Sequence, residues 1–315
     1  MQKRKSGDVR RIINLLAYTL IAFAAVTGCK PAEKKAQGIV IAVSILPQEY
    51  FLERIGGDRV TALVLVGAGQ NPHSYEPTPR QMAALAHARA WIKSGTDFEI
   101  ALEPKIRMQY PSLGIVDGTA GVFFRTLEAH THEGEESPQA EDELESNIDR
   151  HSWLGREPAK IMAGWIRDTL IAIDPNGTDL YRANCERLIA DIDREFDSLK
   201  VRLAPLEGST VFVFHPSFGY FLDEFGIEQE AVETGGKEPT AKALSALIDE
   251  AKRDNPAAIF VQAQFPVSAA QKVADAVGAK VIPLDPLAED WLGNIRQIGE
   301  ALEKNEKETA KRREE

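Results

Sequence analysis

Two sets of strand-like segments, one on each side of a long helical segment, are the feature that most constrains how this chain can fold. In the N-terminal set, residues 39–43, 60–66 and 90–92 form continuous apolar runs. Such runs are typical of strands that are buried on both faces of a parallel sheet. Helical stretches at 48–55 and 79–88 separate them, and this alternation indicates βαβ units.

The C-terminal third of the chain repeats this pattern. Strand-like runs at 210–214, 258–261 and 280–284 alternate with helical stretches at 218–225, 240–253 and 268–277. The alternation predicts a second parallel α/β unit.

The segment 179–203 lies between the two units and has helical periodicity. Its apolar residues recur at intervals of four or three: Tyr181, Cys185, Leu188, Ile192, Phe196, Leu199 and Leu203. Thr178 is placed to cap the helix, which at 1.5 Å per residue would be about 37 Å long. We therefore expect an α/β fold in which two parallel-sheet lobes, 39–178 and 204–315, are joined by one rigid spine helix.

The N-terminus has the outline of an exported lipoprotein. A basic start precedes the mostly apolar run 12–26, which is shorter than the roughly 20 residues of a membrane-spanning helix. The run ends in Val26-Thr27-Gly28-Cys29, which resembles the bacterial lipobox, where cleavage precedes the cysteine and its thiol receives lipid. We expect residues 1–28 to be a signal peptide and 29–38 a lipidated tether. The protein would then be anchored by lipid at Cys29, on the periplasmic or extracellular face of a membrane.

Composition excludes several classes of function. A net charge of −11 is the wrong sign for a nucleic-acid-binding protein. Two cysteines, Cys29 and Cys185, are too few for a disulfide framework or a four-thiolate metal site. Cys185 also lies on the apolar stripe of the predicted helix, where a cysteine behaves as a small buried hydrophobe. A metal site in this chain must therefore use histidine and carboxylate ligands.

Four such side chains follow strands or a loop in the predicted fold. His73, His215 and Asp285 come after predicted strands, and His151 comes after a long acidic segment. In open α/β sheets, ligands bind beyond the carboxyl ends of the strands. Three imidazoles and one carboxylate would satisfy the tetrahedral preference of zinc, so we predict a Zn²⁺ site in the cleft between the lobes. His87 lies within a predicted helix and is excluded.

The acidic segment 128–147 is almost free of apolar residues and contains His130 and His132. Such composition is typical of a solvated loop. The two histidines add a second interpretation, in which the loop assists metal capture as an auxiliary site.

Four motifs resemble those of the ABC-transporter solute-binding proteins for zinc and manganese. Residues 71–79 (NPHSYEPTP) match the first ligand motif of that family nearly residue for residue. Residues 149–154, 215–221 and 284–287 correspond to the second, third and fourth motifs, and the resemblance extends from Ile39 almost to the C-terminus. The family also has a long spine helix, and its zinc-selective members carry a histidine-rich acidic loop.

The second motif departs from its usual form, Asp-Pro-His-x-Trp-Leu-Asp-Pro. Arg150 replaces one proline, and Gly155-Arg156 replaces the final Asp-Pro. The departure bears on the rigidity of the loop that carries His151. Glu76 is the carboxylate nearest in sequence to His73, and it either orients an imidazole or lies in a surface turn.

The resemblance implies a monomeric zinc carrier that delivers the ion to an ABC permease in the membrane. Manganese-carrying members commonly place glutamate at the third ligand position, where this chain has His215. A catalytic zinc keeps an open position for water, whereas three histidines and Asp285 would close the coordination shell, so we expect no enzyme. The alternatives are a manganese- or iron-binding protein of the same family, a surface adhesin and a secreted zinc hydrolase.

Overall fold

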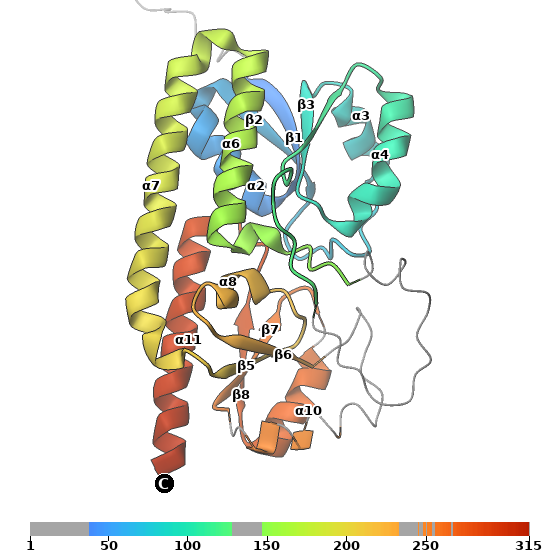
Figure 1. Ribbon diagram of the computed structural model, residues 1–315. Coiled ribbons are helices and arrows are strands. Elements are labelled where there is room, and N and C mark those ends of the chain that lie inside the picture. Colours follow the sequence, from blue (N-terminus) through green and yellow to red (C-terminus); the bar gives the residue numbers. More distant parts are fainter. Residues whose placement is uncertain are drawn as a thin grey trace, which may run out of the picture. The chain divides into compact units, whose positions relative to one another are not determined.

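A computed structural model describes residues 38–127, 147–232, 245, 248–249, 251–253, 256–265 and 267–314 (Figure 1). The predicted signal peptide, the tether from Cys29 to residue 37, and His130 and His132 lie outside these residues, as does most of the predicted helix 240–253. Within the described part of the chain, no helix is both long enough and apolar enough to cross a membrane.

The N-terminal lobe is built on a four-stranded parallel sheet with the order β2-β1-β3-β4. Its strands are β1 (Ile39–Ile45), β2 (Val60–Val66), β3 (Ala90–Lys93) and β4 (Gly114–Asp117), connected through α2 (Leu46–Gly56), α3 (Pro79–Leu85) and α4 (Asp97–Gln109). The central strand β1 is buried along most of its length, as its continuous apolar run predicts.

The C-terminal lobe repeats the architecture with a second parallel sheet of order β6-β5-β7-β8. Its strands are β5 (Thr210–Val213), β6 (Glu228–Ala231), β7 (Ala258–Gln262) and β8 (Lys280–Leu284), and its shorter helices are α8 (Gly219–Asp223) and α10 (Val267–Val277). The two-lobed parallel α/β fold is therefore confirmed.

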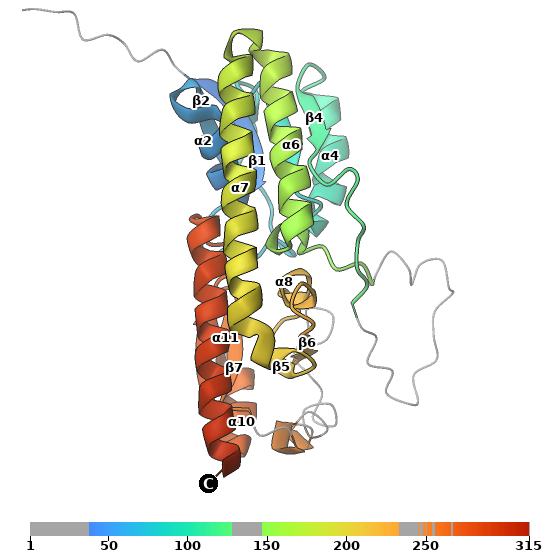
Figure 2. The same cartoon turned by 60° about the vertical axis from the view of Figure 1, so that its left-hand side comes forward.

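Three long helices lie beside the sheets: α6 (Arg156–Ile173), α7 (Thr178–Leu203) and α11 (Trp291–Glu314). The helix α7 packs against α2 and α6 of the N-terminal lobe and against α11, which follows the second sheet (Figures 1 and 2). All seven apolar residues of its predicted stripe are buried, Cys185 included. The long helix thus contacts elements of both lobes.

One detail of that helix differs from the prediction. Thr178 is the first helical residue rather than the cap, which is Gly177, and the Thr178 hydroxyl donates a hydrogen bond to the carbonyl of Pro175 over 2.8 Å. The preceding 3-10 turn, η3 (Pro175–Gly177), holds the hydroxyl on that carbonyl, so it does not cap the helix.

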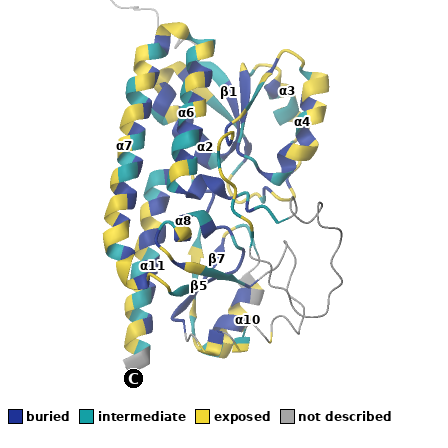
Figure 3. Ribbon diagram, viewed as in Figure 1, coloured by how far each residue is buried: buried dark blue, intermediate teal, exposed yellow. Residues whose placement is uncertain are grey.

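One cluster of buried apolar residues extends through both lobes, and a second lies within the C-terminal lobe; buried residues are dark blue in Figure 3. Trp291, at the start of α11, packs on Phe51 of α2 with ring centroids 4.9 Å apart. Its indole donates to the Trp153 carbonyl, and the Trp153 indole donates to the Pro286 carbonyl, each over 2.8 Å. Because both indoles are fully buried and hydrogen-bonded, these contacts fix the loops at the lobe junction.

Candidate metal site

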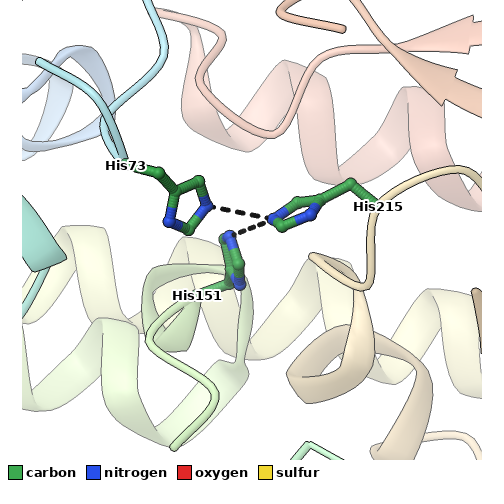
Figure 4. Close-up of side chains that lie close together, drawn as sticks. All are labelled: His73, His151 and His215. Carbon is green, nitrogen blue, oxygen red and sulfur yellow. Dashed lines mark hydrogen bonds between the residues drawn. The ribbon is translucent and has the colours of Figure 1, made fainter. Parts of the chain in front are cut away.

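Three histidines from separate segments meet where the two lobes adjoin. His73 lies in the loop after β2, His215 follows β5, and His151 immediately precedes the 3-10 turn η2 (Ser152–Leu154). The Nε2 atom of His215 lies 3.1 Å from that of His73 and 3.2 Å from that of His151 (Figure 4). One ring nitrogen from each histidine falls within 4.8 Å of the other two, a grouping that could hold a metal ion.

The spacing of these nitrogens suits a tetrahedral ion. Zinc–nitrogen distances of about 2.0–2.1 Å and tetrahedral angles place neighbouring ligand nitrogens about 3.3 Å apart. The observed separations of 3.1 and 3.2 Å are close to that value. Two of the three pairs of nitrogens are therefore already spaced nearly as a tetrahedral ion requires.

Each of two histidines is oriented by a carboxylate on its other ring nitrogen. His73 Nδ1 lies 2.6 Å from Asp97 Oδ2, and His151 Nδ1 lies 2.8 Å from Asp149 Oδ1. A carboxylate there favours the tautomer that carries its proton on Nδ1 and leaves the Nε2 lone pair for a metal. Both Nε2 atoms point into the cluster, as this tautomer requires.

The two carboxylates are held in their charged form. Burial raises the pKa of Asp149, but hydrogen bonds from His151 and Arg125 lower it by more. Burial likewise raises the pKa of Asp97, while the His73 hydrogen bond and the Arg150 charge lower it by more. Both carboxyls therefore have a pKa below the ordinary value and accept hydrogen bonds at neutral pH.

His215 is fixed mainly through its backbone. Gln262, the buried last residue of β7, accepts the His215 N–H over 3.1 Å and donates to the His215 carbonyl over 2.5 Å. The same side-chain nitrogen donates to Ser217 Oγ over 2.9 Å. The imidazole stacks on the ring of Phe265 with centroids 4.7 Å apart. The adjacent strand thus sets the position of this histidine.

Asp285, the fourth predicted ligand, does not belong to the group of converging ligand atoms. Its Oδ1 accepts hydrogen bonds from the Gln264 amide over 2.8 Å and from the Leu287 N–H over 2.9 Å. It nevertheless lies at the edge of the site, because Gln264 and the following Pro286 and Leu287 line the same pocket as the three histidines. Neither of these hydrogen bonds uses Oδ2.

The carboxylate partner of His73 is one that the sequence did not indicate. Glu76, the nearest carboxylate in sequence, is exposed, and Asp97 occupies the position instead. Asp97 is the first residue of α4 and lies 24 residues from His73 along the chain. No sequence motif links Asp97 to His73, because the strand β3 lies between them in the chain and the two residues meet only in the folded protein. His87 is exposed and lies apart from the group.

Arg150 and Arg156, which differ from the usual form of the second motif, both form ion pairs. Arg150 Nε lies 2.8 Å from Asp97 Oδ1, so this arginine pairs with the carboxylate that holds His73. Arg156 pairs with Asp193 and Asp197 of the long helix α7, each over 2.8 Å. His151 itself is buried, although the proline that usually precedes it is absent.

Comparisons of sequence and of structure both find similar proteins. A family model described as the periplasmic component A of the zinc-uptake complex matches residues 41–305. A solved structure of a ZnuA deletion mutant with zinc bound is 34% identical, with a TM-score of 0.77, covering 85% of this chain and 98% of that one.

Two curated relatives extend the comparison. A putative metal-binding protein of Chlamydia muridarum is 25% identical over 83% of this chain and 90% of its own length. The manganese-binding lipoprotein MntA of Halalkalibacterium halodurans is 25% identical over 71% of this chain and 70% of its own length. The relatives thus include proteins named for manganese as well as zinc.

Proposed function

Because the chain belongs to the family of the periplasmic component A of zinc-uptake complexes, we propose that it binds Zn²⁺ outside the cytoplasm and delivers it to an ABC permease. Members of this family are metal-binding transport components without enzymatic activity, and they act with a permease and an ATPase. The protein would act as a monomer, with the ion as its cargo.

The proposed ligands are the Nε2 atoms of His73, His151 and His215, with Asp285 as the fourth. The observation that carries this assignment is the convergence of three imidazole nitrogens at 3.1 and 3.2 Å. Asp285 would bind through Oδ2, while Gln264 and the Leu287 N–H hold Oδ1. Three nitrogen ligands and one carboxylate form a closed tetrahedral shell, which suits binding and release better than catalysis.

Zinc is favoured over manganese by the ligand types. Imidazole suits zinc, whereas manganese prefers oxygen ligands in octahedral surroundings. A surface adhesin is the second candidate. Adhesion would depend on the exposed surface of the protein and not on the three histidines, so it would be a role in addition to metal binding.

Metal analysis of the purified mature protein, residues 29–315, tests the proposal directly. After expression with the native export signal, we expect one zinc per chain that survives dialysis and is removed only by a chelator. A protein that retains no transition metal, or that retains manganese from medium containing both ions, contradicts the proposed cargo.

Lipid attachment at Cys29 is the first specific prediction. The Val26-Thr27-Gly28-Cys29 sequence places Cys29 at the modification position, whereas Cys185 is fully buried in α7. Fatty-acid labelling in cells should mark the wild type and a Cys185→Ala control, but not Cys29→Ala. Label retained in Cys29→Ala would assign the lipid to another residue.

The second prediction is that the acidic segment 128–147 assists capture but is not the tight site. Fixing a polar segment around a metal costs roughly 1–2 kcal/mol per residue in backbone entropy, which the ion would have to offset. The Leu127 N–H donates to the Asn147 carbonyl over 2.7 Å, so a short glycine-serine linker can replace residues 129–146 without moving their neighbours.

Titration of this deletion with zinc should still show one tight site per chain. The double substitution His130→Ala/His132→Ala, which keeps the length of the segment, serves as the matched control. Loss of the tight site in both variants would make His130 or His132 a primary ligand.

A further inference from the structure

We infer that Arg150 is a positioning residue for the metal ligand His73, acting through the carboxylate of Asp97. The inference rests on the proposed metal site and adds a residue to it. Arg150 is adjacent to His151 in the sequence, yet its side chain contacts Asp97, the carboxylate that orients His73. The pair therefore couples two of the loops that carry ligands.

Asp97 uses one oxygen for each partner. Its Oδ2 lies 2.6 Å from His73 Nδ1, and its Oδ1 lies 2.8 Å from Arg150 Nε. With one oxygen held by the guanidinium, rotation of the carboxylate is restricted, and the other oxygen stays aimed at the imidazole. The ion pair on one oxygen and the charge-assisted hydrogen bond on the other form a chain of three groups that is well suited to fix the ring.

The guanidinium is itself anchored on the backbone. Arg150 Nη1 donates to the carbonyl of Gly95 over 3.2 Å. Gly95 has a φ of +82°, a conformation that favours glycine, and its N–H donates to the buried carboxylate of Glu99 over 2.9 Å. Glu99 also accepts the Ser94 N–H over 2.7 Å. Arg150 thus joins Asp97 to a turn whose N–H groups are held by the Glu99 carboxylate.

His73 is the ligand that most needs such support. Its side chain is 30% exposed, against 7% for that of His151, and it lies in the irregular segment between β2 and α3. His151 and His215 are buried, and His215 is also fixed by Gln262 through two backbone hydrogen bonds. Loss of Arg150 should therefore disturb His73 and leave the other two histidines in place.

Zinc titration of four variants tests the coupling. Residues that hydrogen-bond to metal ligands typically contribute 10- to 100-fold in affinity, so Arg150→Ala should weaken zinc binding about tenfold and Asp97→Ala by at least as much. Because Arg150 acts through Asp97, the double variant should bind no more weakly than Asp97→Ala alone. Arg107→Ala removes the same charge from the same lobe, where Arg107 pairs with Glu103, and should bind within twofold of the wild type.

A spectroscopic measurement on the metal-free protein separates this inference from the proposed function. In protein with ¹⁵N-labelled histidine, the Nδ1 protons of His73 and His151 should both exchange slowly with water. Arg150→Ala should lose the His73 signal selectively, and Arg150→Lys should restore part of it. This result is expected even if the cargo is not zinc.

Unchanged zinc affinity in Arg150→Ala, or strictly additive losses in the double variant, would overturn the inference. Retention of the His73 proton in Arg150→Ala would overturn it as well, whatever the affinity. A thermal unfolding curve of each metal-free variant shows whether a loss comes from unfolding, and Arg150→Lys then provides the folded comparison. Absence of tight metal binding in the wild type would contradict the proposed function alone.

Discussion

His151→Ala should lose tight zinc binding, whereas His87→Ala should bind as the wild type does. Structural zinc sites contribute about 10–16 kcal/mol over four ligands, so one imidazole accounts for roughly 3 kcal/mol, or more than a hundredfold in affinity. His151 is buried within the cluster, and His87 is exposed and remote from it. Competition with a chelator of known affinity measures both variants on one scale.

A third variant, Asp149→Asn, should have a zinc affinity between those of the wild type and His151→Ala. Asp149→Asn keeps the size of the side chain but removes the charge that orients His151 Nδ1, and it should cost 10- to 100-fold. Asp149 also pairs with Arg125 over 2.9 Å, so the unfolding temperature of the Asp149→Asn variant must be measured as well, to show whether the substitution destabilises the fold. Equal affinities for the wild type and His151→Ala would remove His151 from the ligand set, even with the transport function retained.

The strands that sequence reasoning located are those with continuous apolar runs. The segments predicted at 60–66 and 280–284 match β2 and β8, and those predicted at 39–43 and 258–261 lie within β1 and β7, which are buried along most of their length as central strands of parallel sheets are. The strands β4 and β6 lack this signal: they read Gly-Ile-Val-Asp and Glu-Gln-Glu-Ala, with at most two consecutive apolar side chains. The backbone pairing, rather than apolar side chains, defines them.

Two of the helices missed from the sequence, α11 and α4, have a short apolar face or a proline in their interior. In α11 the buried apolar residues are Trp291, Ile295, Ile298 and Leu302, all in its first half, and the rest is rich in charge. In α4, Pro104 lies inside the helix, where proline normally argues against one. Tertiary packing on the sheet and on α7 stabilises these segments more than local preference does.

Some residues of the candidate site could likewise be predicted from the sequence, and others could not. The segments that carry His73, His151 and His215 could be located because each belongs to a motif or follows a strand, and the structure brings the three together. Asp97 and Arg150 could not, since their roles depend on a contact between β3, α4 and the second motif. The motif comparison singled out Arg150 only because it replaces a proline, and its contact with Asp97 is visible only in the structure.

Zinc should displace manganese from the wild-type protein at equal concentrations, with an affinity more than about tenfold higher. The physical reason is the donor set, because three imidazole nitrogens match the preference of zinc, and the Irving–Williams order adds to the difference. His215→Glu should narrow the gap, since it exchanges a nitrogen for the oxygen donor that manganese prefers. Competition titration of the metal-free protein with both ions measures the ratio.

The surroundings of His215 make this substitution a fair test. Its backbone is held by Gln262, so a glutamate there starts from the same position. His215→Gln, which supplies a neutral oxygen, separates the effect of donor type from that of charge. Equal or tighter manganese binding by the wild type would assign the protein to the branch that includes its manganese-named relative, and the ligand positions would stand while the cargo changed.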